Sequence, residues 1–176
     1  MKSLITVIGL TLASTIVVAA DSSATATYVG NADQGKSKSV TCAGCHGSDG
    51  NSAVADYPKL SGQHATYLQS TLKAYRDGSR ANAIMAGFAA ALSDEDIADL
   101  AAYFSAQTPS TGAVEADLVA RGQQLYRFGD SEKGISACAA CHGPTGAGVA
   151  SAVFPSLKGQ WAAYSETQLK AYRDGQ

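Results

Sequence analysis

Two short sequence motifs, which we call words, hold most of the side chains that could do chemistry. The stretches TCAGCHGSDG and ACAACHGPTG both contain the pattern Cys-x-x-Cys-His, and their first cysteines are 96 residues apart. All four cysteines of the chain and two of its three histidines lie in these words, namely Cys42, Cys45, His46, Cys138, Cys141 and His142. Such a concentration in two identical patterns indicates a chemical role.

The spacing within each word suits the covalent attachment of heme. Two thiols separated by two residues can add across the two vinyl groups of the macrocycle, and the imidazole that follows can turn beneath its plane to ligate iron. Each word meets this requirement once. We therefore predict two covalently attached heme c groups, with His46 and His142 as iron ligands and the four cysteines as attachment points.

Other uses of four cysteines explain the pattern less well. Two disulfides could form in any of three pairings, but they would not require a histidine in the same place twice. A zinc site would need the cysteine pairs close together in one small module, whereas these pairs lie in separate repeats. A thioredoxin-like redox pair would need a strand before the motif, and no strand pattern precedes either word.

The sixth coordination position of each iron decides what that heme can do. A methionine thioether there closes the site for electron transfer and raises the reduction potential, whereas an open position permits ligand chemistry. Met85 is the single methionine of the first repeat and lies in SRANAIMAGFAAALSD, between two predicted helices. Methionine is also common in cores. We expect Met85 on a loop that folds back over the first heme and ligates its iron.

The first twenty residues have the composition of an export signal peptide. Lys2 gives a positive start, and residues 4–20 contain no charge. Because this stretch is shorter than the roughly 20 apolar residues that a membrane-spanning helix needs, we expect cleavage before Asp21 and not an anchor. A second small-x-small site at residues 24–26 is the alternative cleavage point. The product is expected in the periplasm, an oxidising compartment.

A longer repeat surrounds the two words and indicates two small domains. YPKLSGQHATYLQSTLKAYRDG, which begins at Tyr57, is echoed by FPSLKGQWAAYSETQLKAYRDG, which begins at Phe154. The stretch AQTPSTGA between the copies has a proline, a glycine and no charge, as a linker would. We predict a first domain over residues 21–106, a linker over 107–113 and a second domain over 114–176.

Helical spacing dominates both copies, so we predict an all-α fold. SDEDIADLAAYFSAQ begins with Ser93 as an N-cap, followed three residues later by Asp96, and its apolar residues share one face. HATYLQSTLKAYRDG stops at Gly78, and EADLVARGQQLYRFG repeats the helical pattern in the second copy. Large apolar side chains are few for a domain of about 80 residues, a size at which a core is marginal. A heme in each domain would complete the core.

These features make the chain similar to class I cytochromes c arranged in tandem, and it most closely resembles the diheme cytochrome c4 family. The resemblance covers residues 30–176. It rests on the two Cys-x-x-Cys-His words, on YPKLSGQ and FPSLKGQ, on the repeated LKAYRDG, and on YRFGDSEKGISACAACHGPTGAG. It implies two small domains, each wrapped around one heme and packed about a pseudo-twofold axis.

The resemblance also implies roles for residues around each histidine. Pro58 and Pro155 match the prolines whose backbone carbonyl accepts the second N–H of the axial histidine, a bond that fixes the imidazole and tunes the iron. Leu60 and Leu157 match residues that line the heme pocket. The plainer interpretation of Pro-x-Leu is a turn into a helix, and both can hold.

In the family the first helix of a domain crosses the last helix at a glycine. Gly35 matches that glycine in the first copy, with Tyr103 or Phe104 as its aromatic partner, and Gly122 is the counterpart in the second copy. The third histidine, His64, is a tryptophan in the second copy. We expect His64 at the surface or at a helix start, and not on iron.

The second copy stops where the first continues toward Met85. The 97-residue offset between the copies places the equivalent of Met85 at position 182, beyond Gln176, and the last helix of that copy is missing as well. We interpret this as a truncated second domain, so the sequence as given supplies no methionine for the second heme. The alternative is an open second heme that binds small ligands or peroxide.

Together these features predict an exported, soluble diheme cytochrome that carries single electrons. The resemblance implies respiratory partners, commonly a quinol-oxidising complex upstream and a terminal oxidase or reductase downstream, with any membrane association made through those partners. A net charge of −2 without a basic cluster argues against nucleic-acid binding. The alternatives are a heme enzyme, either a peroxidase or a sulfur-compound dehydrogenase that uses an open second heme, and a fixed cytochrome subunit of an oxidase complex.

Overall fold

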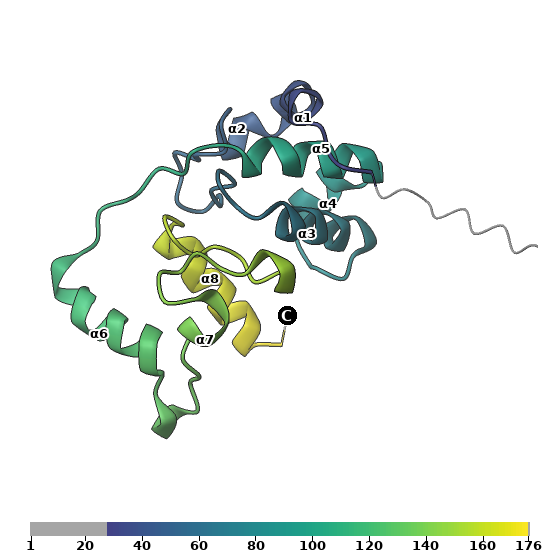
Figure 1. The fold of residues 1–176 in the computed structure, drawn as a ribbon. Coiled ribbons are helices and arrows are strands. Elements are labelled where there is room, and N and C mark those ends of the chain that lie inside the picture. The colour runs from purple at the N-terminus through teal and green to yellow at the C-terminus, as the bar shows by residue number, and fades with distance from the viewer. Residues whose placement is uncertain (1–27, 176) are drawn as a thin grey trace, which may run out of the picture.

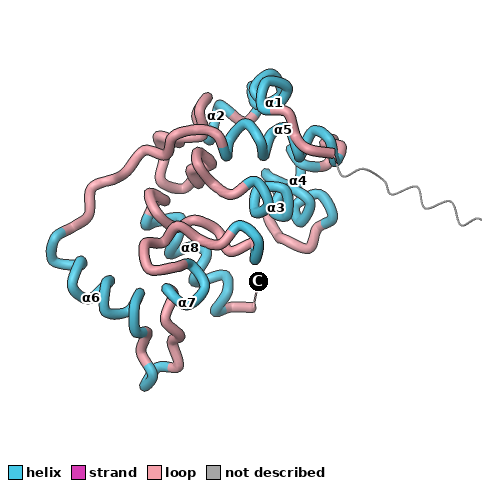
Figure 2. Tube along the Cα trace, viewed as in Figure 1, coloured by secondary structure: helices cyan, strands magenta, loops and turns pink. Residues whose placement is uncertain are grey.

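The computed structural model describes residues 28–175 of the chain. The predicted signal peptide, over residues 1–20, and both of its candidate cleavage sites lie outside these residues. Figure 2 shows helices and loops but no strand in the part described. β structure there is limited to two isolated antiparallel bridges, one joining Asp130 with Ile135 and one joining Val149 with Phe154. The all-α prediction is therefore confirmed. Within residues 28–175, no helix is long and apolar enough to cross a membrane.

From residue 28 onward, the first unit contains five α-helices and one short 3-10 turn, whose order can be followed in Figure 1. They are α1 (Ala32–Lys38), η1 (Ser39–Thr41), α2 (Ala43–His46), α3 (Ala65–Asp77), α4 (Ala83–Ala89) and α5 (Asp94–Ser105). Helix α5 packs on both α1 and α3, and α4 packs on α3. The second unit repeats part of this order with α6 (Ala116–Phe128), η2 (Ser131–Lys133), α7 (Ala139–His142), η3 (Ala150–Ala152) and α8 (Ala162–Arg173).

The helix boundaries follow the capping residues in the sequence. Ser93 forms a capping box with Asp96 at the start of α5: the Ser93 side chain accepts from the Asp96 N–H, and the Asp96 carboxylate accepts from the Ser93 N–H. The Asn31 side chain caps α1 by accepting from the N–H groups of Asp33 and Gln34 in the first turn. Gly78 ends α3 in the left-handed conformation, at φ 81°. The predicted start of α5 at Ser93 and the predicted end of α3 at Gly78 are confirmed.

The core of the first unit lies between α3 and α5. Its buried cluster consists of Leu68, Leu100, Ala101, Tyr103 and Phe104. At the crossing of α1 and α5, Gly35 is buried against the backbone of Asp99 and the Cβ of Tyr103, because no side chain separates the two helices. Tyr103, and not Phe104, is therefore the aromatic residue that meets Gly35.

The second unit has no comparable crossing within the described residues. None of the residues of α6 is buried, and α7 is the described element on which it mainly packs. Gly122, the counterpart expected for Gly35, has nothing within 4 Å of the place where a Cβ would stand. In Figure 1, α6 stands away from α8, at the end of the extended chain that leaves α5.

The structure corrects one expectation about Met85. Met85 lies in the short helix α4 and not on a loop. The Asn82 side chain accepts a hydrogen bond from the Met85 N–H at 2.9 Å, and this cap starts the helix immediately before the apolar run AIMAGFA. An asparagine three residues before a methionine in an apolar run was the sequence signal for this helix.

Between α5 and α6 the chain has no regular structure. This stretch includes the predicted linker, residues 107–113. The start of this stretch is hydrogen-bonded to the first unit. The Asn51 amide donates to the Thr108 carbonyl at 3.1 Å, and the Ser110 N–H donates to Asn51 Oδ1 at 2.7 Å. From residue 111 to residue 115 every side chain is exposed.

Candidate functional site

The first Cys-x-x-Cys-His word forms the one-turn helix α2. Cys42 is its N-cap residue and His46 is its last residue, so both cysteines and the histidine project from a single turn. Gly47 ends the turn at φ 81°, a conformation that residues with a Cβ rarely adopt, and the chain can then reverse direction. The word is thus presented by α2, which follows the short turn η1 and the helix α1 that crosses α5.

The imidazole of His46 is buried and held by one backbone group. His46 is 6% exposed, and its Nδ1 lies 2.8 Å from the carbonyl oxygen of Pro58. Because a carbonyl can only accept, the proton must be on Nδ1. Nε2 therefore keeps its lone pair, which is the form that ligates iron. Pro58 is brought to His46 as the resemblance implied.

The second word repeats this geometry. Cys138 is the N-cap residue of α7, His142 is its last residue, and Gly143 ends the turn at φ 76°. His142 Nδ1 lies 2.9 Å from the carbonyl oxygen of Pro155. His142 is only half-buried. Because its Nδ1 also faces a carbonyl, the proton is on Nδ1, and its Nε2 keeps a lone pair as in His46.

A glycine carbonyl in each copy fixes the proline segment relative to the histidine. The Gly50 carbonyl accepts from the N–H groups of Leu60 and Ser61, at 2.8 and 3.2 Å. The Gly146 carbonyl accepts from the N–H groups of Leu157 and Lys158, at 2.8 and 3.0 Å. These forked bonds tie the residues that follow each proline to the loop that follows each histidine.

Burial affects the protonation of His46 and Cys42 in the first word. Burial lowers the pKa of His46, although the hydrogen bond to the Pro58 carbonyl works in the opposite direction. Burial raises the pKa of the Cys42 thiol, although a hydrogen bond with Thr41 works against it. The imidazole is therefore neutral at pH 7, as a metal ligand must be.

The donor set of each word fits a covalently attached heme. All four thiols are free, so none is spent in a disulfide. Within residues 28–175, no group of three or more His, Cys, Asp or Glu side chains gathers as a zinc cage would require. Cys42 and Leu60 are both half-buried against the core cluster of the first unit. The Cys42 thiol of the first word therefore lies in apolar surroundings.

The remaining predicted site residues lie farther along each unit. Leu157 is half-buried beside Gly146. Met85 is half-buried on α4, which packs on α3. His64 is the N-cap residue of α3, at a helix start as expected, and its Nε2 lies 2.8 Å from the carbonyl oxygen of Ala147 in the second unit.

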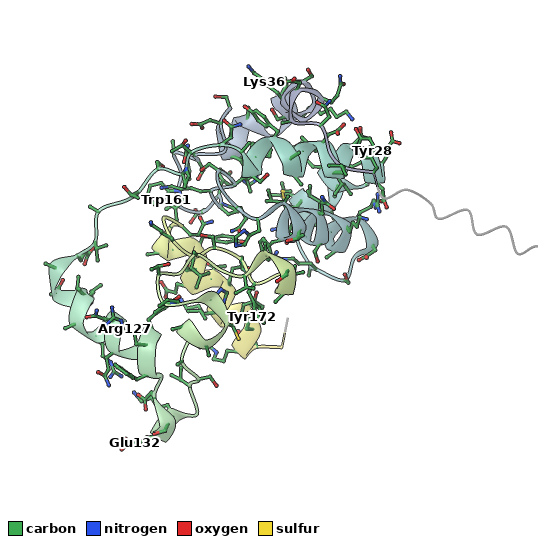
Figure 3. The ribbon with its side chains drawn as sticks, in the orientation of Figure 1. Tyr28, Lys36, Arg127, Glu132, Trp161 and Tyr172 are labelled. Carbon is green, nitrogen blue, oxygen red and sulfur yellow. The ribbon has the colours of Figure 1, made fainter. Side chains whose placement is uncertain are left out.

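Sequence reasoning missed the residues that join the two units. Lys59, Gln63, Ser156, Gln160 and Trp161 form hydrogen bonds across the interface. The indole Nε1 of Trp161 donates to Ser52 Oγ at 2.8 Å, and the Lys59 ammonium lies 4.3 Å from the centre of the Trp161 rings. Figure 3 shows Trp161 where the second unit approaches the first. The Gly-Gln pair shared by the two copies was the available signal.

A cavity of about 440 Å³ opens beside this interface, between α3 and α8. Arg80 lines it and donates to four neutral oxygens: the hydroxyls of Tyr67, Thr71 and Tyr164, and Gln168 Oε1. Neither Cys-x-x-Cys-His word lines this cavity. It is therefore a feature of the contact between the units, and none of the predicted iron ligands lines it.

Comparison with known proteins finds matches to both units of this chain. The sequence profile of the family described as cytochrome c matches twice, over residues 32–107 and 119–176. Cytochrome c4 of Pseudomonas aeruginosa is 44% identical over 146 residues, with coverage of 83% of this chain and 73% of that protein. The thiosulfate dehydrogenase electron acceptor of Thiomonas intermedia is 43% identical over 146 residues, with coverage of 78% of this chain and 65% of that protein.

The fold has a close match among solved structures. The crystal structure of reduced recombinant cytochrome c4 from Pseudomonas stutzeri superposes with a TM-score of 0.80 at 41% identity. The superposition covers 84% of this chain and 82% of that one. The similarity therefore extends over both units and not over a single repeat.

Proposed function

This chain belongs to the cytochrome c4 family, and we propose that it carries single electrons between respiratory redox proteins in the periplasm. It is a diheme electron-transfer cytochrome, with heme c bound covalently. When bound, the heme irons supply the redox chemistry by cycling between ferrous and ferric states. Export by a signal peptide over residues 1–20 belongs to this proposal.

We assign the ligands and attachment points from the two words and their surroundings. The attachment points are Cys42, Cys45, Cys138 and Cys141, the axial ligands are His46 and His142, and Met85 is the sixth ligand of the first iron. Pro58 and Pro155 hold the imidazoles, and Leu60 and Leu157 line the pockets. The two heme domains span residues 21–106 and 114–176, joined by the linker at 107–113.

The strongest support for this proposal is the hydrogen bond that both histidines make to a proline carbonyl. Both histidines have Nδ1 within 2.9 Å of a proline carbonyl, so each presents Nε2 in a fixed direction with its lone pair free. A rigid ligand limits the rearrangement that accompanies a change of oxidation state. Two such sites in one chain, with their proline segments facing each other across one interface, favour a carrier that passes electrons between its own hemes.

Heme content and redox titration test the assignment. The chain, matured with heme, should contain two hemes and take up two electrons in two one-electron steps. The double variant Cys138→Ala/Cys141→Ala should keep one heme and one step, and its partner Cys42→Ala/Cys45→Ala should keep the other. A wild-type chain with a single heme, or a double variant that still holds two, would contradict the assignment.

A turnover assay separates a carrier from a heme enzyme. A carrier is oxidised by ferric partner proteins but should not consume hydrogen peroxide or thiosulfate catalytically when no partner is present. Sustained consumption of either compound by the purified chain would favour the enzyme class instead. Prevention of that turnover by cyanide would assign it to an open heme.

A specific relative suggests one partner class. The Thiomonas intermedia protein is named as the electron acceptor of a thiosulfate dehydrogenase. If this chain has the same role, a thiosulfate dehydrogenase and thiosulfate should reduce it faster than a quinol-oxidising complex and quinol do. The opposite order of rates would favour the respiratory assignment. Omission of thiosulfate or quinol serves as the control for each pair.

A further inference from the structure

The peptide group that holds each proposed axial histidine is also hydrogen-bonded to the opposite domain. In the first domain the Pro58 carbonyl faces His46 Nδ1 at 2.8 Å. The N–H of the same peptide group, which belongs to Lys59, donates to Gln160 Oε1 at 2.9 Å. Gln160 Nε2 returns a bond to the Lys59 carbonyl at 3.0 Å. One glutamine of the second domain thus holds the backbone beside His46 from both sides of Lys59.

The second domain contains the same arrangement in reverse. The Pro155 carbonyl faces His142 Nδ1 at 2.9 Å, and the N–H of that peptide group, on Ser156, donates to Gln63 Oε1 at 2.8 Å. Gln63 Nε2 donates to the Ser156 carbonyl at 3.0 Å. Because the two glutamines occupy the same position in the two copies, the contact is reciprocal about the pseudo-twofold axis.

The orientation of each glutamine amide is fixed by its own chain. Gln63 Oε1 also accepts from the His64 N–H at 3.0 Å, and Gln160 Oε1 accepts from the Trp161 N–H at 3.0 Å. Each amide oxygen therefore receives two N–H donors while each amide nitrogen faces a carbonyl, so a flipped amide would lose all three bonds. Gln63 and Lys59 are only 7% and 6% exposed, and water does not readily replace these bonds.

A hydrogen bond at one end of a peptide group changes the strength of the bond at its other end. When the Lys59 N–H donates to Gln160, the Pro58 carbonyl oxygen becomes more negative and accepts more strongly from His46. A stronger acceptor at Nδ1 makes the imidazole a better donor to iron, and a more basic ligand favours the ferric state. Each glutamine therefore acts on an iron that it does not touch.

We propose that Gln160 and Gln63 are positioning residues that lower the reduction potential of the heme in the opposite domain. Gln160 acts through the Pro58–Lys59 peptide on the heme of His46, and Gln63 acts through the Pro155–Ser156 peptide on the heme of His142. The proposal rests on the proposed ligation by the two histidines. It makes the potential of each heme depend on the closure of the interface.

The test compares the reduction potentials of the two hemes in variants of each glutamine. In Gln160→Leu, the equilibrium constant for reduction of the His46 heme should rise about three- to tenfold, where tenfold corresponds to about 59 mV for one electron. The potential of the His142 heme should stay unchanged. Gln63→Leu should give the mirror result. Spectroelectrochemical titration of the full chain, with each heme assigned from its own shifted proton resonances, measures both potentials in one molecule.

Two further variants separate polarisation from a loosened interface. Gln168→Leu removes the 2.5 Å contact with Arg80 across the same interface but leaves both proline peptides intact, so both potentials should stay at the wild-type values. Gln160→Glu keeps an oxygen acceptor for the Lys59 N–H, so the potential of the His46 heme should not rise. Amide hydrogen exchange at Lys59 should be faster in Gln160→Leu and should remain slow in Gln168→Leu.

Some results would overturn the role of the two glutamines without contradicting ligation by the two histidines. Equal shifts of both hemes in Gln160→Leu, or the same shifts in Gln168→Leu, would show that a loosened interface is the cause. Faster exchange at Lys59 without any change of potential would show that polarisation does not reach the iron. If His46 were not a ligand, the wild-type spectrum and heme content would already reveal it.

Discussion

Gly35 on α1 lies directly against the backbone carbonyl of Asp99 on α5. A Cβ at position 35 would overlap that carbonyl oxygen and would stand 2.7 Å from the Cβ of Tyr103. Because the obstruction is backbone, it can yield only if the two helices separate. Helix α1 leads through η1 into α2, so this crossing also decides where the first Cys-x-x-Cys-His word stands.

Gly35→Ala should therefore destabilise the first domain by about 1–3 kcal/mol, the usual cost of an overpacked contact. Denaturant unfolding of the heme-loaded chain measures it. The repeat supplies a matched control in Gly122→Ala, where nothing lies within 4 Å and the better helix propensity of alanine should stabilise α6 by up to about 1 kcal/mol. Equal effects at both positions would mean that the α1–α5 contact is not the cause.

Acid stability should depend on Lys38, which contacts Asp96 at 2.7 Å and Asp99 at 2.6 Å. The Lys38 hydrogen bond, helped by Ser93, lowers the pKa of Asp96 to about 2. Burial opposes ionisation of Asp99, but its hydrogen bonds from Lys38 and from two other donors lower its pKa as well. Since both carboxyls have folded-state pKa values below the ordinary 3.8, their stabilisation is complete above about pH 4 and is lost as the pH falls toward 2.

Lys38→Met should accordingly lower the melting temperature at pH 7, and the difference from wild type should shrink as the pH falls from 4 to 2. Thermal unfolding across that range measures the effect. Lys36→Met is the control, because Lys36 lies on the same helix and forms no ion pair within residues 28–175. A difference from wild type that stays constant down to pH 2 would contradict the assignment.

Met85→Ala should remove the weak near-infrared band that iron–methionine ligation gives in the ferric state. It should also lower the potential of the first heme and open that heme to cyanide, because the variant lacks the thioether that we propose for the sixth position. Ile84→Ala, at an exposed neighbour on the same helix, should leave the band and the potential unchanged. A band that survives in Met85→Ala would show that another group is the ligand.

The indole–hydroxyl bond between Trp161 and Ser52 should stabilise the packing of the two domains by about 1 kcal/mol. A double-mutant cycle with Trp161→Phe and Ser52→Ala isolates this bond, since Ser52 also donates to the Tyr57 carbonyl and each single variant changes more than one contact. Chemical denaturation of the four heme-loaded chains gives the coupling energy. Additive effects would mean that the bond does not contribute.

The parts of the fold that depend on neighbours in the chain were predictable. Ser93 and Asp96 form a capping box because their spacing alone brings each side chain to the other's backbone N–H. Gly78 ends α3 because it tolerates a positive φ. The helix at Met85 was missed although Asn82 caps it, because the apolar run was assigned to a loop on the expectation of ligation.

Residue types and local spacing were enough to predict two thiol pairs, each followed by an imidazole, and a repeat that carries them in two helical units. Covalent attachment and ligation need only the residue types and their local spacing. The groups that lie behind the two histidines depend instead on how the two units pack. Gln160 is 101 residues from Lys59, and Gln63 is 93 residues from Ser156. No periodicity marks such pairs, because they meet only when two separately folded units pack face to face.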